Sequence, residues 1–172
     1  MKKIILTICL IFVLSTNHVF ANTTYFVDFS YVLNKSKAGK EAQEIMKKKI
    51  KSSNEKFTKL EKKILDDEKD LISKKNVLKD EEYQKKIKAL RERVANLQKD
   101  KRSFFEKINK QRSESRKKLL NSLTPIMESY MKTNNIKIII DKKNVLLGDA
   151  SLDLTKTITE LLNKELKSLN LN

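Results

Sequence analysis

The chain has 172 residues and a formal net charge of +16, from 38 Lys and Arg against 22 Asp and Glu. Aromatic residues make up 6% of the chain and Trp is absent, so a large globular core is not expected. Cys9 and His18, the single cysteine and the single histidine, both lie near the N-terminus. Without that segment the chain has no thiol and no imidazole, which excludes disulfides, thiol nucleophiles, His-dependent triads and His/Cys metal sites.

The N-terminus has the pattern of a secretory signal peptide. Lys2 and Lys3 precede an apolar run from Ile4 to Leu14, and Val19-Phe20-Ala21 offers a cleavage site. We expect residues 1–21 to be removed after Ala21 and the protein to be exported, leaving a net charge of +14 once the two lysines are subtracted. An uncleaved N-terminal anchor is the alternative. A lipoprotein is disfavoured, because the residues before Cys9 are not the small ones that lipidation needs.

The first expected elements are short. Thr24–Phe29 (TYFVDF) is rich in aromatic and β-branched residues, which is typical of a strand. A turn of helix is expected over Ser30–Asn34. Ser36 is a suitable N-cap for a helix that begins at Lys37.

Residues 37–133 are expected to form a long antiparallel helical hairpin. Apolar residues recur seven apart, and the pattern resumes after a polar break, as in a coiled-coil seam. The first helix is expected over about 37–78, which spans roughly 60 Å, and the return helix over about 81–132. Asp80 is the expected cap of the return helix, and Pro125 should kink it or mark a change of packing partner. The seam residues are Ile50, Phe57, Ile64, Leu71 and Leu78, then Ile87, Leu90, Val94, Leu97, Phe104 and Ile108.

Polar residues interrupt this seam on both helices. Asp67 and Lys74 on the first helix, and Lys101, Gln111 and Ser115 on the second, occupy positions where apolar residues would be expected. We expect the hairpin to bend at these places.

The C-terminal part is expected to complete a small body at the root of the hairpin. A strand over Ile136–Ile140, a turn over Asp141–Asn144 and a second strand over Val145–Leu147 are expected, with burial on both faces. An amphipathic helix should follow from about Asp153. Because strands come from both ends of the chain, residues 22–36 and 134–172 should form one unit. The fold class is therefore mainly α with a small β body and a long antiparallel coiled-coil hairpin.

No catalytic, cofactor or metal site is expected. Acidic groups such as Asp66-Asp67 are flanked by lysines on helices, where a solvated helix face is the simplest interpretation. Asp28 and Asp141 follow apolar strands, but turn or helix-start roles suit them better. An enzyme is accordingly disfavoured.

The bend of the hairpin is the candidate binding region. Basic residues there surround Val77, Leu78 and Tyr83, and a partly apolar, positive tip suits a chain that is apolar and acidic. The alternative is that the lysines only keep the protein soluble while Val77 and Leu78 pack across the bend. The candidate residues are Lys74, Lys75, Val77, Leu78, Lys79, Tyr83, Lys85 and Lys86.

The order of these features resembles the Skp/OmpH family of periplasmic chaperones over the whole length after the leader. The resemblance rests on YFVDF at residues 25–29, on Ala38-Gly39-Lys40 at the start of the hairpin, and on the segments Ile136–Val145 and Leu152–Thr155. It implies a homotrimer that holds unfolded outer-membrane proteins in the periplasm between three hairpins, without ATP. Contact with anionic lipid or lipopolysaccharide is possible for such a protein. The implied trimer body contains Tyr25, Phe26, Val27, Ile138, Ile139, Ile140, Val145, Leu146 and Leu147.

Two other functions compete with this one. A structural or adaptor hairpin of the cell envelope is the first alternative, although only two glycines and few residues remain for the β-rich domains that such proteins carry. A basic nucleic-acid-binding coiled coil is the second, and export would exclude nucleic acid as a partner.

Overall fold

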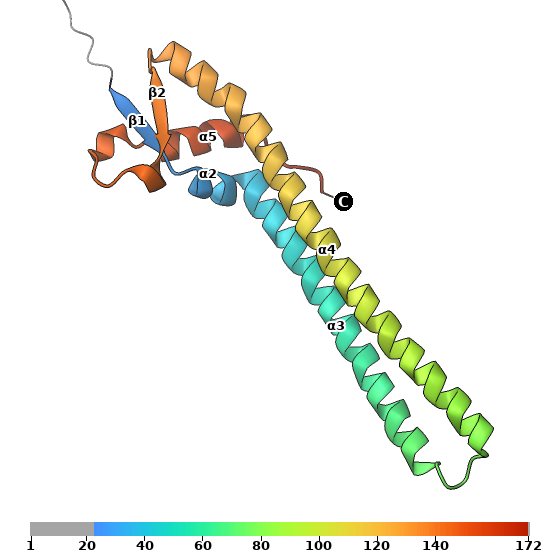
Figure 1. Ribbon diagram of the computed structural model, residues 1–172. Helices are drawn as coiled ribbons and strands as arrows, with labels where there is room; N and C mark the ends of the chain where they lie inside the picture. The colour runs from blue at the N-terminus through green and yellow to red at the C-terminus, as the bar shows by residue number, and fades with distance from the viewer. Residues whose placement is uncertain (1–22, 172) are drawn as a thin grey trace, which may run out of the picture.

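The computed structural model describes residues 23–171. The expected signal peptide, with Cys9 and His18, lies outside the described residues. A small body sits at one end of the molecule, and a long two-helix hairpin projects from it (Figure 1). Within residues 23–171, no helix combines the length and the apolar character needed to cross a membrane.

The body is built from both ends of the chain. Strand β1 (Thr24–Val27) pairs in parallel with β2 (Ile138–Asp141), and helix α2 (Phe29–Lys35) and helix α5 (Thr155–Glu165) pack beside them. Two short 3-10 turns, η1 (Lys142–Asn144) and η2 (Ala150–Leu152), connect β2 to α5. The prediction that the two ends of the chain meet is confirmed.

The hairpin consists of α3 (Lys37–Ser73) and α4 (Asp80–Thr133). Helix α3 ends five residues earlier than expected, because the chain turns over 74–79, where the amides of Val77 and Leu78 both donate to the Lys74 carbonyl. The N-cap of α4 is Lys79 and not Asp80, and it makes no side-chain capping bond. Asp80, Glu81 and Glu82 lie instead in the first turn, where their charges complement the helix dipole.

The expected seam joins the two helices. Leu71, Leu97 and Ile108 are buried along it, and the rings of Phe57 and Phe104 meet edge to face at 5.8 Å. Val94 is the exception, with 42% of its surface exposed. The seam was therefore predicted correctly from heptad spacing, apart from this one position.

Two of the polar breaks in the seam are bridged across the hairpin. Asp67 Oδ2 pairs with Arg93 Nη1 at 2.6 Å, and Lys101 pairs with Glu61 while its ammonium lies 5.7 Å from the centre of the Phe57 ring. Ser115 is buried, and its hydroxyl donates to the Gln111 carbonyl at 2.7 Å. Bending at these breaks stays a prediction.

The main core lies where the hairpin meets the body. The largest fully buried apolar side chains there are Leu123, Ile158, Leu162, Val27 and Val32. Helix α4 continues through Pro125, and the residues beyond it face α5. Pro125 thus lies where α4 changes its packing partner, which was one of the two outcomes expected for it.

Three expectations about the strands are wrong. Strand β1 ends at Val27, because Asp28 already caps α2 by accepting a hydrogen bond from the Tyr31 amide. Val145–Leu147 form no strand, and Leu146 and Leu147 lie in an exposed loop. Strand β2 is not buried on both of its faces in the single chain, because Ile138 and Ile140 are exposed.

Asn135 ends α4 in a left-handed conformation, with a φ of 53°. The Ile136 amide donates to the Met131 carbonyl at 2.9 Å, as in a Schellman cap. We expect Asn135→Ala to lower the free energy of unfolding by about 1 kcal/mol, because a Cβ without a polar group is disfavoured at this φ. Asn135→Gly should preserve the stability in the same urea titration, and equal losses in the two variants would contradict the prediction.

Candidate functional site

The tip of the hairpin displays apolar side chains beside lysines. Val77 is 83% exposed and Ile72 is 61% exposed, whereas Leu78 is partly buried beside Leu71 and Leu90. Lys74 forms an ion pair with Asp70 at 2.7 Å, and Lys86 lies 3.8 Å from Glu82. Leu78 packs across the bend, as expected if the tip has only a structural role. Val77 does not pack there and is exposed to solvent.

The positive charge of the hairpin lies nearer its root than its tip. Residues 37–65 contain ten lysines and four glutamates, and residues 94–121, which lie opposite them, contain nine basic and three acidic residues. The tip half, residues 66–93, contains nine basic and eight acidic residues. The net charge is thus +12 in the root half and +1 in the tip half, so the tip is less positive than its run of lysines suggests.

Several exposed apolar residues on the shaft are absent from the sequence-based candidates. Leu65 and Ile72 on α3 each follow a seam residue by one position, and Phe105 on α4 does the same. Each therefore lies about 100° around its helix from the seam. The signal was present in the sequence, but a search limited to the heptad positions does not find it.

A polar network ties the two ends of the chain together in the body. The Thr155 hydroxyl accepts from the Asp28 amide at 2.9 Å and donates to Asp153 Oδ1, while Asp153 Oδ2 pairs with Lys142 at 2.6 Å. These bonds join the end of β1, the turn after β2 and the first turn of α5. Asp28, Asp153 and Thr155 therefore have structural roles, as expected for Asp28.

The ion pair in this network shifts both ionisable groups. Burial opposes ionisation of Asp153, but the hydrogen bonds from Lys142 and Thr155 outweigh it and lower the pKa of Asp153. The hydrogen bond with Asp153, and then its charge, raise the pKa of Lys142. Because the folded state holds Asp153 with a lowered pKa, this carboxylate stabilises the protein above its unfolded pKa of about 3.9. That contribution is lost as the pH falls through the lowered value.

We expect Asp153→Asn to lower the free energy of unfolding by about 1 kcal/mol near pH 7, because an amide keeps the Thr155 contacts but loses the ion pair. The difference from the unmodified protein should narrow as the pH falls below about 4. Urea unfolding at matched protein concentration and several pH values measures it. Lys142→Gln removes the same ion pair, so its difference from the unmodified protein should narrow over the same pH range. A difference that stays constant down to about pH 2 would contradict the argument.

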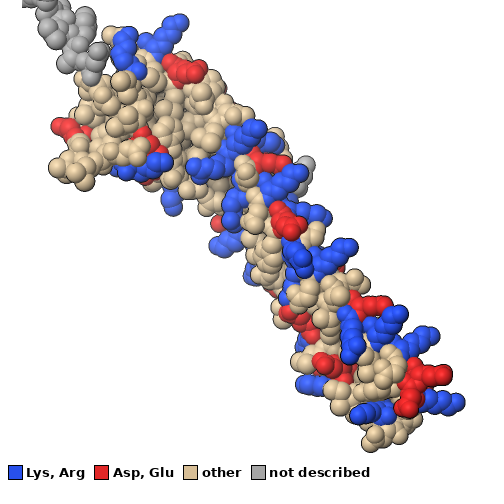
Figure 2. Space-filling model, viewed as in Figure 1, with Lys and Arg blue, Asp and Glu red and all other residues tan. Residues whose placement is uncertain are grey.

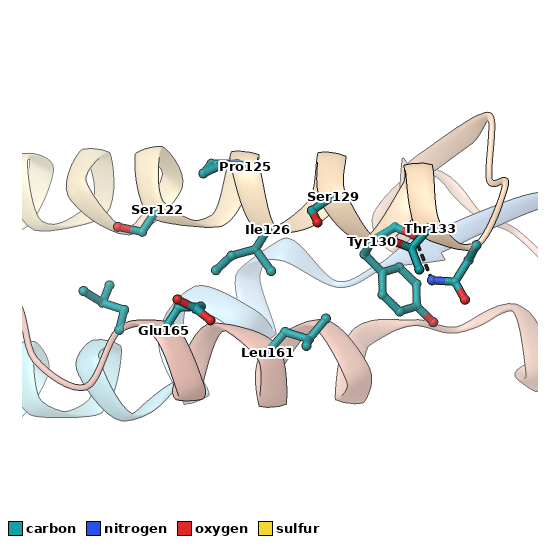
Figure 3. Close-up of a pocket in the computed structure, with 10 residues that line it drawn as sticks. Ser122, Pro125, Ile126, Ser129, Tyr130, Thr133, Leu161 and Glu165 are labelled. Carbon is teal, nitrogen blue, oxygen red and sulfur yellow. Dashed lines mark hydrogen bonds between the residues drawn. The ribbon is translucent and has the colours of Figure 1, made fainter.

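A surface cavity of about 660 Å³ lies between the end of α4 and α5. Ile126 and Tyr130 from α4 face Leu161 from α5 across it, with Ser122 and Glu165 at one end (Figure 3). Asn134 donates to the Tyr130 carbonyl at 2.8 Å at the other end. The lining is mostly apolar, and its polar groups form no cluster that suggests chemistry.

The loop after β2 exposes apolar residues with no cover in the single chain. Leu146 and Leu147 are 95% and 91% exposed, and Ile138 and Ile140 on the preceding strand β2 are also exposed. By contrast, Phe26 and Val27 of β1 are buried and Tyr25 and Ile139 are partly buried. The nine residues expected in the oligomer body thus divide into an internal group and an exposed group.

Metal-binding clusters are absent from the part of the chain that the structure describes: no three His, Cys, Asp or Glu side chains come close enough together. The described acidic side chains serve as helix caps, turn contacts or ion pairs in the cases detailed above.

Comparison with known proteins agrees with this architecture. The chain superposes on the crystal structure of a protein from Caulobacter crescentus CB15, described as an OmpH-like outer membrane chaperone, with a TM-score of 0.81 and 15% sequence identity. The match covers 87% of this chain and 88% of the other. None of the curated proteins compared with the chain matches it. The sequence pattern of the family described as outer membrane protein (OmpH-like) matches residues 23–162, so the chain belongs to the OmpH-like family.

Proposed function

We propose that this protein is an ATP-independent periplasmic chaperone that holds unfolded outer-membrane proteins and prevents their aggregation. The observation that carries the proposal is a basic hairpin with apolar side chains exposed along its shaft and at its tip. Membership of the OmpH-like family and the fold shared with a described chaperone support it. Binding an unfolded chain requires no chemistry, only contacts that compete with its aggregation.

The client suits such a surface. An unfolded outer-membrane barrel protein contains many short segments of alternating polarity, each of them weakly apolar. Many weak contacts along a hairpin hold such a chain better than one deep pocket, because each further contact forms at a high effective concentration. We include the tip residues Val77 and Tyr83 and the surrounding lysines in this surface.

We further propose that three copies assemble through the body, so that three hairpins surround one client. In this assembly Leu146, Leu147, Ile138 and Ile140 supply the apolar contacts, because each of them is exposed to water in the single chain. Phe26 and Val27 also belong to the residues expected in the trimer body, but they are buried within the single chain and stabilise the fold of each subunit.

The test is suppression of aggregation. Purified protein is mixed with a urea-unfolded outer-membrane protein, the urea is diluted, and light scattering is followed without ATP. We expect scattering to fall as the protein approaches one assembly per client. Unchanged scattering would refute the chaperone proposal and favour the envelope adaptor. Binding of the exported protein to nucleic acid in place of the client would favour the other alternative.

A further inference from the structure

The hairpin has two broad faces, and its ion pairs identify them. Lys101 reaches Glu61 on one face, and Arg93 reaches Asp67 on the other. Residues four or seven apart share one side of a helix. Leu65 and Phe105 follow Glu61 and Lys101 by four positions, so both lie on the Glu61–Lys101 side.

The same spacing extends this face along the hairpin. Ile72 lies seven residues beyond Leu65, and Val94 lies seven residues before Lys101. Toward the root, Lys47 lies fourteen residues before Glu61, and Arg112 lies seven residues beyond Phe105. Lys47 and Arg112 also line one groove with Ile50, which confirms that they share a side of the hairpin. We call this surface the Phe105 face: Lys47, Leu65, Ile72, Val94, Lys101, Phe105 and Arg112.

The Phe105 face exposes apolar residues toward the tip, with Glu61 and Glu68 beside them. Toward the root it carries Lys47 and Arg112, in a groove that Glu44 also lines. Leu65, Val94 and Phe105 are each between 42% and 48% exposed, and Ile72 is 61% exposed. On the opposite face, Leu60 is the exposed large apolar residue, among ionic groups such as Lys63 and the Asp67–Arg93 pair. Figure 2 shows one side of the hairpin, on which charged and uncharged surface alternate along its length.

The charge of the hairpin indicates which kind of molecule binds this face. The root half of a second hairpin of the same chain also has a net charge of +12, so two such halves at close range would repel each other. An unfolded polypeptide with a net negative charge and apolar segments complements both parts: its acidic stretches face Lys47 and Arg112, and its apolar stretches face Leu65 and Phe105.

We propose that the Phe105 face, and not the opposite face, is the surface that contacts the client, and that it prefers clients of net negative charge. The inference rests on the proposed holding function and assigns it to one side of the hairpin.

Cross-linking tests the face directly. In a Cys9→Ser background the chain has no other cysteine, so Leu65→Cys and Val94→Cys carry a photo-cross-linker on the Phe105 face. Lys63→Cys and Lys107→Cys carry it on the opposite face, since Lys63 precedes Asp67 by four residues and Lys107 follows Arg93 by fourteen. We expect the first pair to cross-link an acidic unfolded outer-membrane protein at least about tenfold more than the second. Equal yields from both faces would overturn the proposal.

Charge reversal tests the preference for acidic clients. Lys47→Glu with Arg112→Glu should weaken binding of an acidic client about tenfold, and the matched double variant Lys63→Glu with Lys107→Glu should change it less than about twofold. Both variants alter the net charge equally, and circular dichroism checks that the helices persist. Equal losses, or stronger binding of a basic client by the unmodified protein, would overturn the proposal. Failure of the unmodified protein to suppress aggregation would instead refute the holding function itself.

Discussion

Replacing Gly39 with Ala is expected to lower the free energy of unfolding by about 3 kcal/mol or more, the largest single effect anticipated in this chain. Gly39 lies in the first turn of α3, directly against the end of α2. A Cβ at this position would lie 1.9 Å from the Leu33 backbone oxygen and 2.9 Å from the Ser36 hydroxyl oxygen. A backbone oxygen cannot rotate away as a side chain can. The corner between α2 and α3, which Ser36 joins, must therefore open.

Opening this corner has consequences beyond local strain. Ser36 is fully buried there, and its hydroxyl accepts the hydrogen bond of the Gly39 amide that caps α3. Val32 and Ala38, on either side of the corner, are also fully buried in the core at the root. The hairpin would therefore lose its fixed orientation on the body as well as stability.

Urea unfolding followed by circular dichroism measures the effect, at one protein concentration because an assembly shifts the apparent stability. Ser52→Ala, an exposed change in the middle of α3, is the control and should alter stability by less than about 0.5 kcal/mol. A Gly39→Ala protein as stable as this control would show that the corner relaxes easily.

Replacing Leu146 and Leu147 together with Ser is expected to dissociate the assembly while leaving each chain folded. Both side chains are more than nine-tenths exposed in the single chain, so they contribute little to its own folding. If the two side chains are buried between subunits, each substitution removes about 1.5–3 kcal/mol of association free energy. A symmetric assembly repeats this loss at every interface. The mass in solution should then fall from that of a trimer to that of a monomer.

Light scattering coupled to gel filtration measures this mass, and circular dichroism measures the helical content. Val77→Ser is the matched control, because Val77 is also exposed but lies at the far end of the hairpin, and the assembly should survive this change. An unchanged mass in the Leu146/Leu147 variant would remove these residues from the interface. A monomer already in the unmodified protein would refute the proposed assembly itself.

Local spacing was enough to predict most of the helical architecture. Heptad recurrence from Ile50 to Leu78 and from Ile87 to Ile108 predicted a seam that the structure contains, because the spacing that lines apolar residues along one side of a helix is a property of each helix by itself. Ser36 was correctly identified as a cap for the same reason, since its hydroxyl bonds within three residues. The family could also be recognised at this level.

The body depended on contacts between residues far apart in the chain. Asp28 and Thr155 are joined although 127 positions separate them, and strand spacing alone gave no sign of this bond. Val145–Leu147 have the composition of a strand, but no edge pairs with them, and a strand needs a partner that composition cannot supply. The sequence likewise did not show that Leu65 and Phe105 lie on one face of the hairpin. The ion pair between Glu61 and Lys101, which joins the two helices, shows it. Helical periodicity is a property of one segment, whereas pairing and exposure are properties of segments brought together, and so they required the tertiary structure.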